Sequence, residues 1–172
     1  MRVGDGDSRN RAISISVVDH VERRGPAGSY WVVPGRLLAG MYPNAETISE
    51  LRATGVDTFF DLTEDGELDR YELNGLEHRR FPIRDMATPS PELMGEILDA
   101  LDEALDDGRT IYLHCRGGLG RTGTVVGCHL VRAGKTGEDA LADIVAWRGD
   151  NWSPQTQAQK DFVRAWRESG PG

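Results

Sequence analysis

The chain has few cysteines and no long apolar segment, and each absence excludes a class of protein. Its 172 residues include only two cysteines, Cys115 and Cys128, too few for the disulfide framework of a small secreted domain. The two cysteines also lack a Cys-x-x-Cys spacing, so we expect no zinc site and no other cofactor. No apolar run approaches the roughly 20 residues that a membrane-spanning helix needs, and we therefore expect no membrane partner.

The N-terminal residues and the net charge indicate where the protein acts and which partners it lacks. Residues 1–11 are polar and charged and lack the apolar core of a secretory signal, so we expect a mobile tail on a cytoplasmic protein. The remaining residues, 12–172, suffice for one domain with a sizeable core, and we expect a monomer. A formal net charge of −8 argues against nucleic-acid binding, which depends on a cationic surface.

The periodicity of apolar residues and the positions of turn residues predict an α/β fold. The predicted elements follow the order β-β-α-β-β-α-β-α-α-α, which fits a single domain with a central mixed sheet flanked by helices. Ser90-Pro91 is typical of an N-cap and first helical turn, and Ser153-Pro154 predicts the start of the last helix. Residues 12–18 alternate between apolar and polar side chains and are compatible with a further edge strand.

The most informative segment covers residues 114–123, with the sequence His-Cys-Arg-Gly-Gly-Leu-Gly-Arg-Thr-Gly. It follows a stretch typical of a strand and precedes a segment typical of a buried helix. Backbone N–H groups in a glycine-rich loop at a helix N-terminus cradle an anion, and they stabilise a thiolate at Cys115. Arg121 can hold a phosphate through two hydrogen bonds, and Arg84 and Arg116 add positive charge. The pattern predicts a cysteine nucleophile that faces a bound phosphate.

This segment resembles the signature of cysteine-dependent phosphatases of the protein-tyrosine and dual-specificity class. Its glycine run is most similar to that of the cyclin-dependent-kinase-associated phosphatase and its small bacterial relatives, and the resemblance extends from about Trp31 to Trp166. It implies a protein-tyrosine-phosphatase-like fold and metal-independent hydrolysis of phosphomonoesters through a cysteinyl-phosphate intermediate. The implied partner is a protein that carries phosphotyrosine and, for a dual-specificity enzyme, phosphoserine or phosphothreonine.

The resemblance also assigns roles within the loop. The backbone N–H groups that would hold the phosphate oxygens belong to Arg116, Gly117, Gly118, Leu119, Gly120 and Arg121. The Thr122 hydroxyl can donate to the Cys115 sulfur and improve it as a leaving group, or it can cap the following helix. His114 is implied to be buried and to support the loop. Cys128 lies among apolar helical residues, which favours a role in core packing.

Two further segments match functional parts of the family. Asp85 precedes the cysteine on a loop and matches the aspartate that protonates the leaving group, with Asp61 as the alternative and a solvated surface carboxylate as the plainer interpretation. Gln155 and Gln159 belong to a Gln-Thr-x-x-Gln motif that positions the hydrolytic water in tyrosine-specific relatives. Thr156 and Gln159 also match a helix capping box.

Other interpretations of the motifs stay open. The spacing Gly118-x-Gly120-x-x-Gly123 satisfies a dinucleotide-binding fingerprint, but no strand that ends in an acidic residue follows it. The Trp-Pro-Asp and Lys-Asn-Arg-Tyr segments of tyrosine-specific enzymes are absent, which predicts a shallower pocket of the dual-specificity type. The alternative functions are a phosphatase of phosphoinositides, inositol phosphates or RNA 5′-ends, and a phosphate-binding module without turnover.

Overall fold

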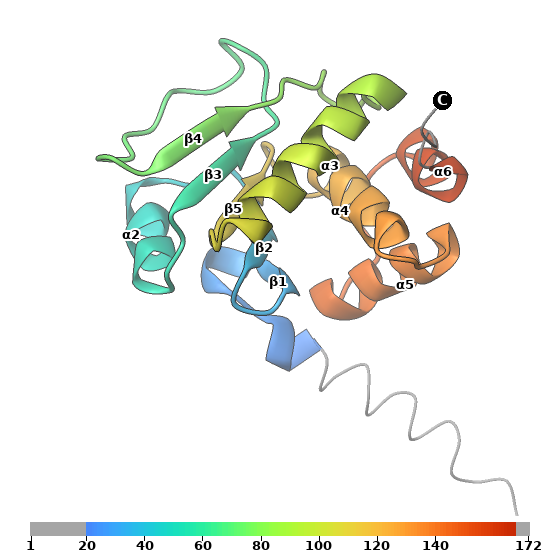
Figure 1. The fold of residues 1–172 in the computed structure, drawn as a ribbon, viewed down its shortest axis with the longest axis horizontal. Coiled ribbons are helices and arrows are strands. Elements are labelled where there is room, and N and C mark those ends of the chain that lie inside the picture. Colours follow the sequence, from blue (N-terminus) through green and yellow to red (C-terminus); the bar gives the residue numbers. More distant parts are fainter. Residues whose placement is uncertain (1–19, 168–172) are drawn as a thin grey trace, which may run out of the picture.

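Five short strands form one mixed sheet at the centre of the fold (Figure 1). The computed structural model describes residues 20–167, so the predicted tail over 1–11 and the possible strand over 12–18 lie outside the described residues. The sheet order is β1-β2-β5-β3-β4, and only β1 and β2 pair antiparallel. The strands are β1 (Tyr30–Val33), β2 (Leu37–Gly40), β3 (Thr58–Asp61), β4 (Glu77–Arg80) and β5 (Ile111–His114). The carboxyl ends of four parallel strands therefore meet at one edge, with the end of β5 in the middle.

Helices cover both faces of this sheet (Figure 1). They are α2 (Ala45–Ala53), α3 (Pro91–Asp106), α4 (Gly120–Arg132), α5 (Gly137–Arg148) and α6 (Gln157–Ala165). Every residue of β2, β3 and β5 is buried, as expected for strands covered on two sides. None of the helices in residues 20–167 combines the length and the apolar content that crossing a membrane requires.

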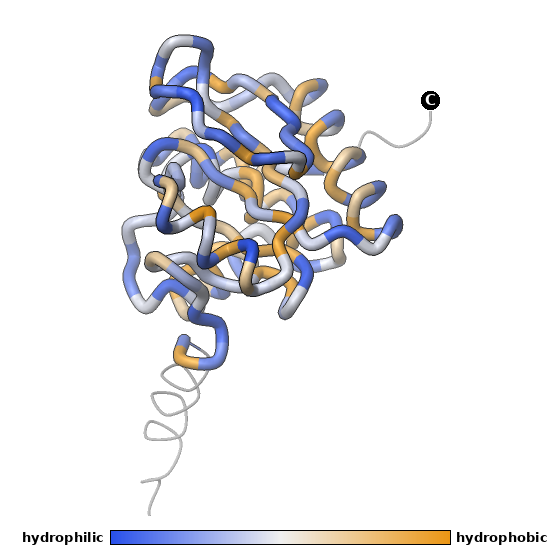
Figure 2. Tube along the Cα trace, turned by 90° about the vertical axis from the view of Figure 1, so that its left-hand side faces the viewer, coloured by the Kyte–Doolittle hydropathy of each residue, from blue (hydrophilic) through white to orange (hydrophobic). Residues whose placement is uncertain are grey.

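The core is divided by the sheet into two apolar clusters. The smaller cluster lies under α2 and contains Ile48 and Leu51 packed with Phe59 and Tyr112 from the strands. The larger cluster joins the opposite face of the strands to the side chains of α3, α4, α5 and α6. Figure 2 shows apolar residues concentrated in the interior, whereas the outer loops are mostly hydrophilic. The predicted α/β architecture and the predicted order of its elements are confirmed.

The start of the last helix was predicted wrongly. The Ser153-Pro154 peptide bond is cis, and α6 begins only at Gln157. Thr156 is the N-cap, because its side chain accepts the Gln159 N–H while the Gln159 side chain accepts the Thr156 N–H. Ser153 instead donates its hydroxyl hydrogen to the carbonyl of Leu119, at 2.7 Å, and ties this segment to the glycine-rich loop.

Candidate active site

The glycine-rich loop connects the end of β5 to the start of α4 at the carboxyl edge of the sheet. Gly118 has a φ of 70°, and a Cβ atom there would lie 2.5 Å from the Gly40 backbone, so only glycine fits. A small cavity of about 170 Å³ opens over this loop. Its lining consists of Asp85, Met86, Cys115, Arg116, Gly117, Leu119, Gly120, Arg121 and Gln155. The fold thus brings together predicted residues from three distant segments; Arg84 is exposed and is not part of this lining.

Arg121 is buried, with a side chain only 1% exposed, and its hydrogen bonds fix the direction of its guanidinium group. Nη1 donates to Glu67 Oε2 and to the carbonyl of Ile83, both at 2.8 Å, and Nη2 donates to Glu67 Oε1 at 2.6 Å. A guanidinium group has five N–H donors. The remaining N–H groups are on Nε and on Nη2, where Asp85 Oδ1 lies 3.2 Å away. A phosphate bound at this edge would accept from both atoms, which is the bidentate geometry expected for arginine.

Glu67 is the functional residue that the sequence did not reveal. Its carboxylate is 9% exposed and also accepts a hydrogen bond from Nε of Arg116 at 3.3 Å. The hydrogen bond from Arg121 lowers the pKa of Glu67 to about 2, so the carboxylate stays charged at neutral pH. Glu67 anchors one edge of the guanidinium group and leaves the other edge to the cavity.

Asp85 reaches the same cavity from the loop before α3. Its Oδ1 atom lies 3.2 Å from Arg121 Nη2 and accepts the Met86 N–H at 3.0 Å. The side chain is 51% exposed, so a proton can reach it from solvent. Asp61, the alternative acid, is 5% exposed and accepts hydrogen bonds from His78 and Thr63. Burial acts to raise the pKa of Asp61, but these hydrogen bonds hold that pKa well below its usual range. Asp61 is therefore ionised at neutral pH and is a poor proton donor.

His114 supports the catalytic loop from inside the protein. It is fully buried, and burial lowers the pKa of its imidazole to about 4, so the ring is neutral. Nδ1–H then donates to the carbonyl of Cys115 at 3.1 Å, and Nε2 accepts the hydroxyl hydrogen of Tyr71 at 2.6 Å. Burial raises the pKa of Tyr71, which keeps it a hydroxyl donor. The loop backbone at Cys115 is thus held through His114 by Tyr71, a residue of the β3–β4 connection.

Cys115 and Thr122 are both buried, but their surroundings differ. Cys115 is 3% exposed at the bottom of the cavity. The hydroxyl of Thr122 is buried without a hydrogen-bond partner in residues 20–167, so the predicted bond to the Cys115 sulfur is not formed in this structure. An unpaired buried hydroxyl is unusual and calls for an explanation. Cys128 is buried in the larger apolar cluster.

The two glutamines of the motif occupy different places. Gln155 lines the cavity, whereas Gln159 is fully buried beneath Gly120. Gln159 Oε1 accepts the Thr156 N–H at 3.0 Å, and Nε2 donates to the carbonyl of Ala87 at 3.1 Å. Both ends of its amide are therefore engaged, and Gln159 ties the loop that carries Asp85 to α6. Within residues 20–167, no cluster of three or more His, Cys, Asp or Glu side chains is arranged to hold a metal ion.

Comparison with known proteins identifies this arrangement. A family model described as "Polymorphic toxin system, DSP-PTPase phosphatase" matches residues 36–135, more than half of the chain. The chain belongs to this family of dual-specificity and tyrosine phosphatases. The predicted resemblance is thereby confirmed, and this phosphatase domain carries the family's cysteine loop within the matched residues.

Individual relatives agree with the family. The chain is 38% identical over 104 residues to the putative tyrosine phosphatase 067L of Invertebrate iridescent virus 3, covering 57% of this chain and 43% of the relative. The active form of Tk-PTP superimposes with a TM-score of 0.71 at 30% identity, covering 81% of this chain and 95% of that one. Kinase associated phosphatase gives a TM-score of 0.66 at 26% identity, covering 74% and 83%. The chain spans less than half the length of the first curated relatives it matches.

Replacing Asp85 with asparagine tests whether Asp85 is the general acid. We expect kcat for phosphotyrosine to fall about 10²- to 10³-fold at every pH, because the amide cannot protonate the leaving oxygen. Asp99→Asn changes a carboxylate that is 78% exposed on α3 and should leave kcat unchanged. Steady-state rates of both variants decide the assignment, and a near-normal rate for Asp85→Asn would refute it.

Replacing Glu67 with glutamine tests the anchor of Arg121. The variant loses a charge-assisted bidentate pair, so we expect KM for a small aryl phosphate to rise about tenfold. The free energy of unfolding should fall by roughly 2 kcal/mol at neutral pH. Glu64→Gln, a change at an exposed neighbour, is the matched control.

The low pKa of Glu67 predicts that the stability of the folded protein depends on pH. The pKa of Glu67 falls from 4.5 to about 2 on folding, so its contribution is present above pH 4.5 and is lost as the pH falls toward 2. The difference in unfolding free energy between the wild type and Glu67→Gln should therefore shrink over this range. Urea titrations at several pH values measure it, and a constant difference would contradict the assigned pairing.

Proposed function

We propose that the chain is a metal-independent phosphomonoesterase that dephosphorylates proteins through a cysteinyl-phosphate intermediate. The observation that carries the proposal is the single cavity in which the buried Cys115, the edge of Arg121 that Glu67 leaves to the cavity, and the Asp85 carboxyl meet. A phosphate placed there would face a nucleophile, a fixed cation and a proton donor at once. The N–H groups of residues 116–121 complete the cradle.

The first step transfers the phosphoryl group to the cysteine. The Cys115 thiolate attacks phosphorus, an S–P bond forms and the ester P–O bond breaks. Asp85 gives its proton to the leaving oxygen, and Arg121 holds two equatorial oxygens through Nε and Nη2. His114 keeps the Cys115 carbonyl in place during the transfer, because its hydrogen bond fixes the loop from below.

The second step returns the enzyme to its starting state. Water attacks phosphorus, gives its proton to the Asp85 carboxylate, and the S–P bond breaks to release phosphate and the thiolate. Gln155 lines the cavity, and we assign to it the orientation of this water. The unpaired Thr122 hydroxyl would donate to the departing sulfur, which would supply the partner it lacks before the reaction.

Gln155→Ala tests the second step alone. If Gln155 positions water, we expect kcat to fall about tenfold and the phosphoenzyme to accumulate, which appears as a burst of p-nitrophenol in stopped-flow measurements. Gln157→Ala is the control, because Gln157 points to Asp161 on the exposed side of α6, with an N–O distance of 2.9 Å. A lower kcat without a burst would assign Gln155 to another step.

The decisive experiment measures hydrolysis of p-nitrophenyl phosphate by the reduced protein in the presence of EDTA. Turnover that survives EDTA supports the proposal, and phosphotyrosine, phosphoserine, phosphoinositide and RNA 5′-phosphate substrates then rank the alternatives. No turnover from a folded, reduced protein would favour a phosphate-binding module.

We further propose that residues 12–172 form the catalytic domain of a monomeric cytoplasmic protein without nucleic-acid or membrane partners.

A further inference from the structure

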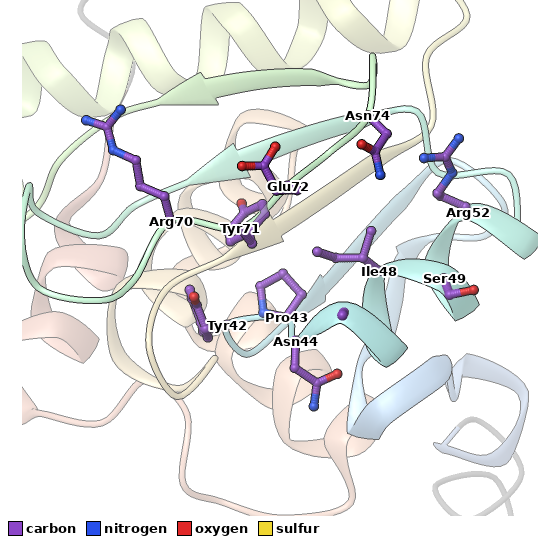
Figure 3. Close-up of a pocket in the computed structure, with 11 residues that line it drawn as sticks. Tyr42, Pro43, Asn44, Ile48, Ser49, Arg52, Arg70, Tyr71, Glu72 and Asn74 are labelled. Carbon is purple, nitrogen blue, oxygen red and sulfur yellow. The ribbon is translucent and has the colours of Figure 1, made fainter.

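A second, larger cavity lies beside the catalytic loop. It has a volume of about 630 Å³ and lies between α2 and the chain segment 70–74 (Figure 3). Tyr42 and Tyr71 form part of its wall, Ile48 of α2 forms another, and Arg70 and Arg52 stand at opposite ends. We call this cavity the α2 groove. None of the proposed catalytic steps uses it.

Two hydrogen bonds link the walls of the α2 groove to the glycine-rich loop and its supporting histidine. The backbone N–H of Tyr42 donates to the carbonyl of Arg116, at 3.0 Å, and Arg116 also lines the catalytic cavity. The Tyr71 hydroxyl donates to His114, the residue before the nucleophile. A residue of the groove wall is therefore in direct contact with a residue of the catalytic cavity, and the two cavities are neighbours.

The lining of the α2 groove is apolar in the middle and cationic at its ends. Arg70 is exposed and makes no hydrogen bond or ion pair with the described residues, so its charge is available to a ligand. Arg52 uses one N–H, on Nη1, to bind the carbonyl of Leu73 at 3.3 Å, and its other donors remain. Glu72 is the one carboxylate in the lining. The groove thus has a net positive charge on a chain whose formal net charge is −8.

We propose that the α2 groove binds the polypeptide that flanks the phosphorylated residue of the substrate, and that it selects an apolar residue with acidic neighbours. A cavity of about 170 Å³ holds a phosphorylated side chain and little more, so the flanking residues must lie outside it. Arg116, which lines that cavity, is hydrogen-bonded to Tyr42, which lines the α2 groove, so a peptide that leaves the cavity on this side would reach the groove. Aromatic and apolar walls suit an apolar side chain, and the two guanidinium groups suit carboxylates on either side of it.

A membrane surface fits the α2 groove less well than a polypeptide. Recognition of anionic lipid surfaces uses clusters of about four to eight basic residues, whereas this groove offers two arginines beside Glu72. The formal charge of −8 would also oppose the approach of an anionic bilayer.

The proposed peptide selectivity of the α2 groove rests on the proposed phosphatase function. The experiment below distinguishes failure of the selectivity from failure of the phosphatase function. Two phosphotyrosine peptides are compared, one with Glu-Leu-Glu on each side of the phosphotyrosine and one with Lys-Leu-Lys. We expect the wild type to show kcat/KM about tenfold higher for the acidic peptide, since two exposed charge pairs are involved. Arg70→Glu should remove or reverse the preference and leave turnover of p-nitrophenyl phosphate within about twofold.

Two further variants sharpen the test. Arg52→Gln should weaken the preference. Arg167→Glu reverses an exposed charge two residues after the end of α6, which Figure 1 shows on the opposite side of the molecule from α2, and should leave the preference intact. Binding of the same peptides to Cys115→Ser reports on the groove even if the wild type has no turnover, so loss of catalysis and loss of selectivity are distinct results. Equal kcat/KM and equal affinity for both peptides would overturn the proposal. So would a higher kcat/KM for a phosphoinositide in anionic vesicles than for either peptide.

Discussion

Replacing Cys115 with serine is expected to abolish turnover of p-nitrophenyl phosphate, with a fall in kcat on the order of 10⁴-fold or more. A serine hydroxyl does not ionise at neutral pH, whereas the loop N–H groups can stabilise a cysteine thiolate. Cys115 is 3% exposed, and oxygen is smaller than sulfur, so the fold should be unaffected. The variant keeps Arg121 and the loop N–H groups and should still bind a phosphopeptide.

Three measurements check the expected result for Cys115→Ser. Steady-state hydrolysis gives kcat, fluorescence polarisation gives peptide affinity, and thermal unfolding confirms the fold. Cys128→Ser is the matched control, because Cys128 is also buried in the larger apolar cluster but lies on α4 and does not line the catalytic cavity. It should retain most of the activity. Comparable turnover by Cys115→Ser and the wild type would remove the covalent intermediate from the mechanism.

Replacing Arg121 with lysine is expected to lower kcat/KM about 10³-fold or more although the charge is kept. The guanidinium group binds Glu67 and the Ile83 carbonyl on one edge and leaves Nε and Nη2 for phosphate on the other. A single ammonium group cannot satisfy both edges. It would be drawn to the Glu67 carboxylate, and the cavity would then present no paired donors to the transferring phosphoryl group.

Kinetics of Arg121→Lys beside Arg116→Lys test this explanation. The Arg116 side chain is 55% exposed, so its replacement should change kcat/KM only a few-fold. Phosphate inhibition should weaken strongly in Arg121→Lys and little in Arg116→Lys. Equal inhibition constants for the two variants would show that the paired donors of Arg121 are not what holds the phosphate.

The parts of the site that the sequence predicted are those encoded by short contiguous patterns. Cys115 and Arg121 lie on one loop whose glycines, strand and helix all follow from neighbouring residues, so their positions were predictable. The prediction that Asp85 shares their site relied on the order of segments in a resembling family. Most of the sheet followed from the same kind of local evidence, because β1, β2, β3 and β5 are short, largely apolar runs between turns, whereas β4 consists of four polar side chains.

Glu67 could not be predicted in the same way. It is 54 residues from Arg121 along the chain and lies in a turn with other carboxylates, among them Glu64, Asp65 and Asp69. Only the pairing of β3 with both β4 and β5 brings this turn over the loop. Similarly, the glutamine motif did not reveal which amide faces the cavity, because that depends on the residue at which α6 begins.

The amide of Gln159 has a consequence for the extent of the catalytic unit. It completes the capping box of α6 and also binds the Ala87 carbonyl on the loop that carries Asp85. The proposed nucleophile, Cys115, and the proposed phosphate-binding residue, Arg121, both precede α6, yet a polypeptide that ended before Gln157 would lose the hydrogen bond that ties the loop of Asp85 to α6. The shortest fragment able to support the full reaction must therefore extend through Ala165, and a fusion partner joined within α6 would uncouple acid catalysis from phosphate binding.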